Sequence, residues 1–370
     1  MVSTALASID TALNIDLSRQ LIGERRLGAL IDALRANRRV LTLNVAGNRL
    51  RDQAAADIAR CLRDNVTLTR IEAGDNEFSG DGMRTLARAL TSTTTLRHLD
   101  LSGNTASAPF VNALASSLKG HLSLRVLRLR SCLLTDRDCA ALAGALRHND
   151  VLHKVDLSAN KIGNDGAVAL GQMLEINFTI RDVSLAENTI GEAGAIALAK
   201  ALTSTSSMTA LSLSGNRGVG PQGIIAFAEA LARQASVEVL DLFDCGMTGD
   251  ATPSLAAAIS ANRTLMWLDV RHNDLGDLAA QSAIVRAIAA NRSLHGVRFD
   301  EWRLQNRDDL GRIHASVSRN RRGGARFPFF CFVRSVVGAG NGAALAGVFT
   351  TIFAMANLDN NDDDGGVKIL

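Results

Sequence analysis

Apolar and polar residues follow one another along this chain in a frame with a period of about 28 residues. In one copy of the frame, Leu152, Val155 and Leu157 are followed by Asn160 and then by Ile162. The polar position of the frame recurs at Gln20, Asn48, Asn76, Asn104, Cys132, Asn160, Asn188, Asn216, Cys245, Asn273 and Trp302. The first seven intervals between these positions are identical, and of the last three the first and the third are longer by a single residue. Because a unit this short can bury its apolar side only against its neighbours, the period predicts a stack of similar units.

The first part of each unit predicts a short β-strand. Val155 and Leu157 are two residues apart and should point inward, whereas Lys154, Asp156 and Ser158 should point outward. A strand, a turn, a helix and a return within one period of the frame place successive strands parallel. Parallel strands lie about 4.8 Å apart but helices need roughly 8 to 10 Å, so the stack must curve with its strands on the inside.

The second part of each unit predicts an α-helix. Leu170 and Leu174 lie one helical turn apart, and the same stripe reappears at Leu198 and Leu202. Asparagine recurs where this helix must stop, at Asn37, Asn65, Asn149, Asn177, Asn262 and Asn291. We expect these asparagines to adopt the left-handed backbone conformation that commonly ends a helix.

The frame reads L-x-x-L-x-L-x-x-N/C-x-L, and in this respect the chain resembles leucine-rich repeat proteins over about residues 12 to 304. The repeat length and the block I-G-x-x-G-A-x-A-L-A-x-A-L, from Ile190 to Leu202, are similar to the ribonuclease-inhibitor-like class of that family. This class includes the repeat regions of NOD-like receptors and the Ran GTPase-activating protein. The resemblance implies an α/β fold, a horseshoe-shaped solenoid with a parallel β-sheet on the concave face and α-helices on the convex face.

The recurring polar position should have a structural role. A buried asparagine amide at the turn after each strand can bond backbone groups of its own unit and of the adjacent unit. We expect such a structural ladder from Asn48, Asn76, Asn104, Cys132, Asn160, Asn188, Asn216, Cys245 and Asn273. At the two cysteines we favour a thiol that fills the same place over a reactive or metal-binding thiol. The first of the longer intervals is explained by an insertion near Gly218 to Pro221, which should bulge the turn between strand and helix.

Composition narrows the functional classes. The chain is 47% hydrophobic and 21% charged with a net charge of +3, which is too balanced to indicate a nucleic-acid partner. Five cysteines form no disulfide framework and the first residues lack the features of a secretory signal, so we expect a cytoplasmic location. No histidine occurs in a catalytic or zinc-binding motif, and no phosphate-binding loop is present. We therefore predict no enzymatic activity, no catalytic residues, no metal, no cofactor and no small-molecule substrate.

The residues that point outward from the predicted strands form one broad face, where a protein partner would bind. Phe243 and Trp267 are in adjacent units and occupy positions that most units fill with small or charged residues. Asp241, Asp269 and Arg271 flank them. Aromatic rings beside arginine and carboxylates are typical of a binding hot spot, so these five residues are candidates for partner binding. The alternative is that both rings pack against the end of the sheet or against the C-terminal segment.

A second group of candidates on the same face is basic. Arg128 and Arg130 lie beside Lys154, with Asp100 and Asp156 at the borders of the group. These three basic residues are candidates for binding a partner. The alternative, which we favour, is a solvated cluster whose charges neutralise one another.

The composition changes where the repeats end. Residues 1–304 should form the leucine-rich repeat domain, 305–326 a polar capping helix and a basic linker, and 327–370 an apolar segment with an acidic tail. The uncharged run that begins at Ser335 and ends at Leu358 is long enough to span a membrane, and the arginines before it would place the repeats on the cytosolic side. Its firmly apolar part, 343–356, is as short as a buried helix, so a segment packed on the repeats or on a partner is an equal alternative. At the other end, the residues before Asp16 leave little room for a separate N-terminal cap.

These features favour a non-enzymatic scaffold that binds a protein partner on its concave face, with a tether to the cytosolic face of a membrane if the C-terminal segment is an anchor. The alternative is a GTPase-activating or regulatory protein, because the repeats are similar in number and type to those of the Ran GTPase-activating protein. That protein also has an acidic C-terminal segment, whereas this chain ends in an apolar segment with only four aspartates, Asp359, Asp362, Asp363 and Asp364. No single arginine can be assigned a catalytic role from the sequence.

Overall fold

The computed structural model describes residues 2–233, 235–300 and 308–323 of the 370-residue chain. The chain divides into two compact units, Met1–Gly324 and Ala325–Leu370. The run from Ser335 to Leu358 that was considered as an anchor belongs to the second unit and lies outside the described residues. Within the described ranges, no helix combines the length and the apolar character that crossing a membrane requires.

The strands of the first unit form one parallel sheet whose strand order follows the chain order, as the repeat period predicts. Within the described residues the eleven strands are β1 (Asn14–Asp16), β2 (Thr42–Asn44), β3 (Arg70–Glu72), β4 (His98–Asp100), β5 (Val126–Arg128), β6 (Lys154–Asp156), β7 (Asp182–Ser184), β8 (Ala210–Ser212), β9 (Val239–Asp241), β10 (Trp267–Asp269) and β11 (Gly296–Arg298). Leu43 pairs with Ile71, and Ile71 pairs with Leu99. Equivalent residues of successive units are therefore neighbours across the sheet.

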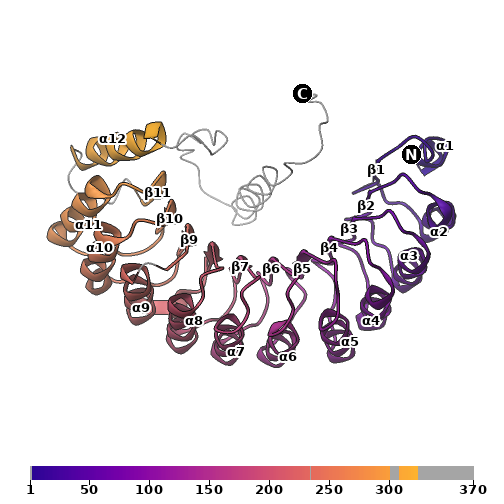
Figure 1. Ribbon diagram of the computed structural model, residues 1–370, viewed down its shortest axis with the longest axis horizontal. Helices are drawn as coiled ribbons and strands as arrows, with labels where there is room; N and C mark the ends of the chain where they lie inside the picture. The colour runs from indigo at the N-terminus through magenta and orange to yellow at the C-terminus, as the bar shows by residue number, and fades with distance from the viewer. Residues whose placement is uncertain (1, 234, 301–307, 324–370) are drawn as a thin grey trace. The chain divides into compact units, whose positions relative to one another are not determined.

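Between successive described strands a helix lies on the outer side of the curved sheet (Figure 1). The α-helices are α1 (Val2–Ala7), α2 (Glu24–Ala36), α3 (Asp52–Asp64), α4 (Gly80–Ala89), α5 (Ala108–Leu118), α6 (Asp136–Leu146), α7 (Asn164–Leu174), α8 (Glu192–Ser204), α9 (Gly220–Ala232), α10 (Thr252–Ala261), α11 (Leu278–Ala290) and α12 (Asp308–Gly323). Three short 3-10 helices are η1 (Leu90–Ser92), η2 (Arg217–Val219) and η3 (Gly249–Ala251). Because helices need more room than strands, this unit curves with its strands on the inner side.

The hydrophobic core lies between the sheet and the helices. Val155 and Leu157 of one unit are 3% and 0% exposed, as the alternation predicts. Leu170 and Leu174 of α7 belong to the same buried cluster. Each fully buried leucine contributes roughly 1.5–3 kcal/mol to stability. The core is therefore continuous along the repeats, and each unit depends on its neighbours.

The asparagine column joins each unit to the unit before it, as predicted. The side-chain Oδ1 of Asn160 accepts hydrogen bonds from the backbone N–H groups of Cys132 and Leu134 in the preceding unit, at 2.9 and 3.0 Å. Its Nδ2 donates to the carbonyl of Leu129 in that unit and to the carbonyl of Leu157 in its own unit, at 2.9 and 2.8 Å. One buried amide therefore satisfies backbone groups of two units that no regular ladder reaches.

The two cysteines of the column fill the same place with a thiol. Cys132 and Cys245 are both 0% exposed. Their Sγ atoms lie 3.4 Å from the Leu101 carbonyl and 3.3 Å from the Leu213 carbonyl. Burial raises the pKa of Cys132 to about 12 and raises the pKa of Cys245 as well. Buried, protonated thiols are suited to packing rather than to reaction.

A second row of asparagines follows the helices, and its backbone conformation contradicts the sequence-based expectation. Asn37 and Asn65 have φ of −66° and −84° with ψ of 143° and 138°, which is extended rather than left-handed. The Oδ1 of Asn65 accepts hydrogen bonds from the backbone N–H groups of Thr67 and Leu68, at 2.8 and 2.7 Å. Its Nδ2 donates to the Leu34 carbonyl of the preceding unit at 2.7 Å. The side chain of Asn65, rather than a left-handed backbone turn, therefore provides hydrogen bonds to the backbone groups where the helices end.

The first of the longer intervals has its extra residue between strand and helix, as predicted. The 3-10 helix η2 occupies this turn, and Gly220 after it has a φ of +60°, a conformation that favours glycine. Val219 lies beside Gly223 in the way that Ile190 lies beside Gly194 in the previous unit. Val219 follows Ile190, and Gly223 follows Gly194, by the longer of the two repeat intervals. The inserted residue therefore comes before Val219 in the sequence.

Some helices receive their N-terminal cap from the preceding unit. Helix α8 begins after Gly191, which has no side chain to accept a hydrogen bond. The Oδ1 of Asn164, in the preceding unit, accepts from the backbone N–H groups of Gly191 and Gly194, both at 2.9 Å. Asp136 does the same for the start of α7. These caps add a further set of links between neighbouring units.

Helices lie at both ends of the described repeats. Helix α1 contacts α2 and buries Val2, so the residues before Asp16 hold a short helix where little room for a separate N-terminal cap was expected. At the other end, α12 lies in the region where a polar capping helix was expected and packs against α11. Its Ile313 is 2% exposed, and the Ser316 hydroxyl donates to the Ile288 carbonyl at 3.0 Å. Helix α12 therefore covers apolar surface of the last unit.

Candidate protein-binding face

The strands present rows of equivalent side chains on the side of the sheet that faces away from the helices. In β3 and β4, the middle residue is buried between two partly buried residues. Two residues expected to face solvent are buried instead, because Lys154 is 5% exposed and Ser158 is 2% exposed. Strands lie only about 4.8 Å apart, so a side chain on this face is enclosed by its equivalents on both neighbouring strands.

Two carboxylates lie side by side at the last positions of β9 and β10. Asp241 pairs in register with Asp269, and both are 0% exposed. Asp241 accepts a hydrogen bond from the Ser212 hydroxyl at 2.8 Å and another from the backbone N–H of Phe243 at 3.1 Å. Burial, followed by the charge of Asp269, raises the pKa of Asp241 to about 7. These two candidates therefore form an internal polar layer rather than the exposed flank of a hot spot.

Arg271 connects this layer to the ring of Phe243. Its guanidinium donates to both oxygens of Asp269, with an Nη2 to Oδ2 distance of 2.6 Å. The central carbon of the same guanidinium lies 5.2 Å from the centroid of the Phe243 ring. That ring also packs against the ring of His272, with centroids 4.6 Å apart and planes inclined by 37°. Phe243 is therefore held in place on two sides while it remains partly exposed.

Trp267 forms a second aromatic site on the same face. Its ring lies against Gly296 of β11, where any Cβ would overlap the ring. The guanidinium carbon of Arg298 lies 5.3 Å from the ring centroid, and burial lowers the pKa of Arg298. The alternative that an aromatic ring packs on the end of the sheet thus holds for one face of Trp267. The ring of Phe243 is therefore brought together with Arg271, and the ring of Trp267 with Arg298.

All three basic candidates are ion-paired. Arg128 pairs with Asp100 at 3.7 Å, Arg130 with Glu187 at 2.7 Å and Lys154 with Asp182 at 2.7 Å. Burial raises the pKa of Asp182 to about 6, although the charge of Lys154 opposes the shift. These ion pairs are those that a self-neutralised cluster would make, although Lys154 is buried rather than solvated.

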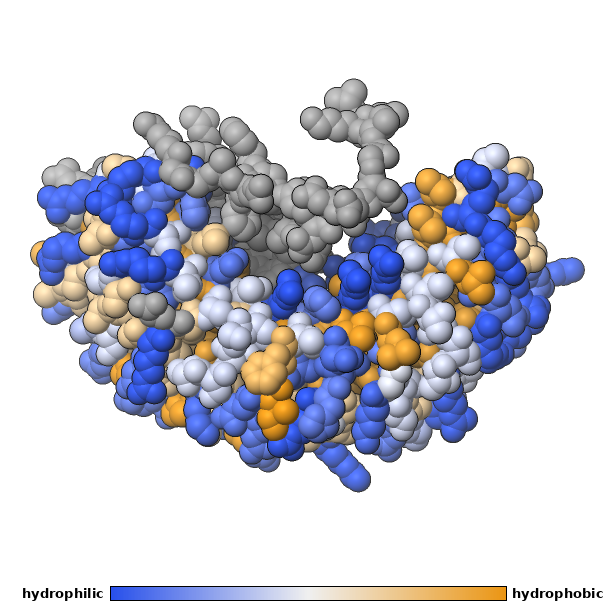
Figure 2. All heavy atoms as spheres, viewed as in Figure 1, coloured by the Kyte–Doolittle hydropathy of each residue, from blue (hydrophilic) through white to orange (hydrophobic). Residues whose placement is uncertain are grey.

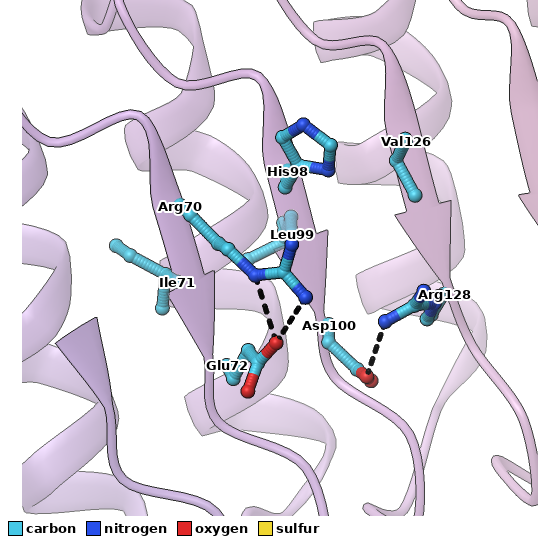
Figure 3. Close-up of a pocket in the computed structure, with 8 residues that line it drawn as sticks. All are labelled: Arg70, Ile71, Glu72, His98, Leu99, Asp100, Val126 and Arg128. Atoms are coloured by element: carbon cyan, nitrogen blue, oxygen red, sulfur yellow. Dashed lines mark hydrogen bonds and ion pairs between the residues drawn. The ribbon is translucent and has the colours of Figure 1, made fainter. Parts of the chain in front are cut away.

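A shallow pocket lies between β3, β4 and β5. Figure 3 shows Arg70 turned toward Glu72 and Arg128 turned toward Asp100, with His98 at the upper side of the pocket. The Nε of Arg70 lies 2.8 Å from an oxygen of Glu72. Burial, followed by the charges of nearby arginines, lowers the pKa of His98 to about 4. Sequence reasoning singled out Arg128 but not Arg70 or His98, although Arg70 and His98 occupy equivalent positions of adjacent units.

The described residues offer little to a metal ion. No group of three histidine, cysteine or acidic side chains within these ranges is placed to hold one. Cys61 and Cys139 are buried in addition to the two cysteines of the column. Burial raises the pKa of Cys61 to about 12. Chemistry at these thiols is therefore disfavoured in the folded protein.

Comparison with protein families identifies the repeat. The sequence profile described as Leucine Rich repeat matches residues 93–105, 148–171, 177–199, 206–228 and 261–282. Each of these segments contains one strand of the parallel sheet. The chain is a leucine-rich repeat protein. The narrower ribonuclease-inhibitor-like class stays a prediction.

Short stretches of this leucine-rich repeat protein are similar to curated proteins. The mouse protein "Centrosomal protein of 78 kDa" is 34% identical over 86 residues, which cover 23% of this chain and 11% of the relative. The human protein of the same name is 31% identical over 86 residues, covering 23% and 12%. The human protein "NACHT, LRR and PYD domains-containing protein 5" is 40% identical over 76 residues, covering 20% and 6%. The matched segment therefore spans a small part of each relative.

Solved structures also match part of this leucine-rich repeat protein, and two of them serve as examples. One is titled "Leiomodin-1 Actin-Binding Site 2 (ABS2)" and has 17% sequence identity and a TM-score of 0.33, covering 49% of this chain and 88% of the other. The other is the tropomodulin C-terminal domain of Caenorhabditis elegans, with 15% identity and a TM-score of 0.33, covering 51% and 94%. A similarity this low indicates no partner for the chain.

Proposed function

We propose that this leucine-rich repeat protein is a non-enzymatic scaffold that binds a protein partner on the concave face of its sheet. The two aromatic sites at Phe243 and Trp267 carry the proposal. Each ring is partly exposed on this face, and each is stacked by an arginine, Arg271 or Arg298. Aromatic and arginine side chains are enriched among the few residues that dominate the energy of protein–protein interfaces.

Both rings are positioned before a partner arrives. Phe243 is held by Arg271 and His272, and Trp267 is held against Gly296. Immobilising a side chain on binding costs about 0.5–1.5 kcal/mol, so a ring that is already fixed loses less on association.

The names of two relatives support a scaffold located in the cytoplasm. Both the mouse and the human relative are named as centrosomal proteins. The tether from Ser335 to Leu358 stays a prediction, which extraction with alkaline carbonate tests. Recovery of the protein in the soluble fraction would exclude an anchor.

The alternative as a GTPase regulator is tested separately. We expect the chain to leave the rate of GTP hydrolysis by small GTPases unchanged. An acceleration would overturn the assignment as a non-enzymatic scaffold.

The concave face is tested by partner capture from cytosolic extract on the immobilised full chain, followed by mass spectrometry. Trp267→Ala and Phe243→Ala should each reduce capture about tenfold or more, as expected for residues that anchor an interface. Leu278→Ala is the control, because it removes a 49% exposed apolar side chain from α11 on the outer layer. Arg130→Glu should have little effect if the basic cluster is only self-neutralised.

The outcomes separate binding from folding. Each variant is first compared with the parent protein by its melting temperature, because Trp267 also packs against Gly296. Unchanged capture by both aromatic variants would exclude this part of the face. A chain shortened to end at Gly323 should retain capture if the repeats carry the binding site.

A further inference from the structure

Three arginines on one edge of the repeats lack the ion pairs that the concave arginines make. Arg97, Arg125 and Arg181 each immediately precede a strand, and each is exposed. In the described part of the chain, none of the ion pairs includes these three side chains. By contrast, Arg128 and Lys154, which lie a few positions further along their units, are both paired with carboxylates. The three arginines therefore have positive charge available for a ligand.

The backbone places these arginines in one line across the repeats. Arg125 donates its backbone N–H to the Arg97 carbonyl, His153 donates to the Arg125 carbonyl, and Arg181 donates to the His153 carbonyl, each at 2.8 Å. With about 4.8 Å between strands, the line from Arg97 to Arg181 is about 14 Å long. The charges of Arg97 and Arg125 reach His98 at the start of β4, where they contribute, after burial, to lowering its pKa.

Two exposed apolar side chains lie on the same edge. Leu122 is 78% exposed and Phe178 is 64% exposed. Each lies in the loop between a helix and a strand, three residues before Arg125 or Arg181. The unit between them has the exposed Asp150 at the equivalent position. Figure 2 shows hydrophobic side chains next to hydrophilic ones over the face of the repeats that it draws.

We propose that this edge binds an acidic protein segment that also carries apolar side chains. We call the surface the basic edge, and it consists of Arg97, Leu122, Arg125, Phe178 and Arg181. The guanidinium groups match carboxylates in bidentate geometry, and the two apolar side chains match leucine or aromatic residues of the segment. The basic edge lies apart from the aromatic sites at Phe243 and Trp267, so this proposal goes beyond the proposed function.

The geometry favours a segment in extended conformation. An extended or polyproline-like chain advances about 3.1–3.4 Å per residue, so three residues span the step of two units from Arg125 to Arg181. A nucleic acid offers phosphates to the arginines but no apolar side chains to Leu122 and Phe178. The modest net charge of +3 also favours a protein segment.

The test is selection of random short peptides, displayed on phage, against the immobilised full chain. Enriched peptides should combine carboxylates with at least one large apolar residue. The double variant Arg125→Glu/Arg181→Glu should weaken their binding at least about tenfold, because attraction becomes repulsion. The double variant Leu122→Ala/Phe178→Ala should weaken it by about threefold to tenfold, as expected for two partly desolvated anchors.

The matched control is a double variant that makes the same change of charge on the same edge but outside the proposed site. Arg39 and Arg292 are exposed arginines in the equivalent loops before β2 and β11. Arg39→Glu/Arg292→Glu should change peptide binding by less than about twofold. Arg39 lies about two strand spacings, roughly 10 Å, from Arg97, and Arg292 lies about four, roughly 19 Å, from Arg181, so screening by salt weakens both effects. Because all substituted side chains are exposed, the variants should fold, and unchanged melting temperatures confirm it.

Several outcomes would overturn the proposal. It fails if enriched peptides lack acidic residues, if they bind the Arg125→Glu/Arg181→Glu variant normally, or if the control variant loses binding to the same extent. It also fails if Trp267→Ala, rather than the arginine variant, abolishes the binding of every enriched peptide. That result would assign the binding site to the concave face. Tighter binding of single-stranded RNA of similar length, lost in the same arginine variant, would assign the basic edge to nucleic acid.

Discussion

The asparagine column can be tested at Asn160, which is 8% exposed and bonded to the unit before it. Asn160→Ala removes the oxygen that accepts hydrogen bonds from the backbone N–H groups of Cys132 and Leu134. A buried N–H group without an acceptor costs about 1–3 kcal/mol. Two such groups, together with the lost contacts to carbonyls, should lower the free energy of unfolding by on the order of 4 kcal/mol.

Urea unfolding followed by circular dichroism measures this loss. The melting temperature should fall by about 6 °C, because unfolding roughly 320 residues has an entropy of about 0.7 kcal/mol/K. Asn112→Ala is the matched control, since Asn112 is exposed on α5, and it should change stability by less than about 0.5 kcal/mol. Asn160→Cys should fall between the two, because a thiol occupies the equivalent place at Cys132 but is a weak acceptor. If Asn160→Ala were as stable as Asn112→Ala, the column would fill space without linking the units.

Asp241→Asn should flatten the dependence of stability on pH. The pKa of Asp241 is raised to about 7 in the folded protein, compared with about 3.9 in the unfolded chain, so the folded state binds this proton more tightly. The resulting stabilisation is complete below about pH 4 and is lost as the pH rises through 7. Urea midpoints that change equally between pH 5 and pH 8 in both proteins would contradict this. Asn164→Ala should lower the free energy of unfolding by about 1 kcal/mol through loss of the α8 cap, whereas Asn164→Asp should retain stability, as Asp136 caps α7. In a Cys331→Ser background, an alkylating reagent should modify no thiol until the protein unfolds, because the remaining cysteines are buried, and labelling of the native protein would refute the assignment.

Repetition made the fold predictable from the sequence, because the same apolar frame appears in register in every unit. The bonds of Asn160 followed from the need of a buried amide to find partners. The row at Asn65 was predicted wrongly in conformation, although its position was right. Asparagine can end a helix through its backbone or through its side chain, and the spacing of asparagines along a chain does not distinguish the two.

The candidate face was harder to predict than the fold. Alternation along a strand gives the direction of a side chain but not its depth, and Asp241 and Asp269 are buried by neighbours on adjacent strands. Pairing across units is also hidden in a linear sequence, as for Arg130 and Glu187, which are 57 residues apart. Charge composition predicted that the cluster neutralises itself, but the partners of each arginine depend on the register of the sheet.

Among the described residues, the hydrogen bonds that the asparagine side chains of the column make to another unit run in one direction along the chain, to the preceding unit. The Oδ1 of Asn76 accepts from the backbone N–H groups of Asn48 and Leu50, so the turn of one unit is completed by the unit that follows it. Synthesis proceeds from the N-terminus, and a new repeat therefore keeps unsatisfied N–H groups until the next repeat has left the ribosome. Chains cut at successive repeat boundaries should accordingly exchange the amide hydrogens of their last turn rapidly. Each repeat would therefore complete its folding only after the next repeat has been synthesised. Units that have nearly the same structure would thus fold one after another, in the order of the chain.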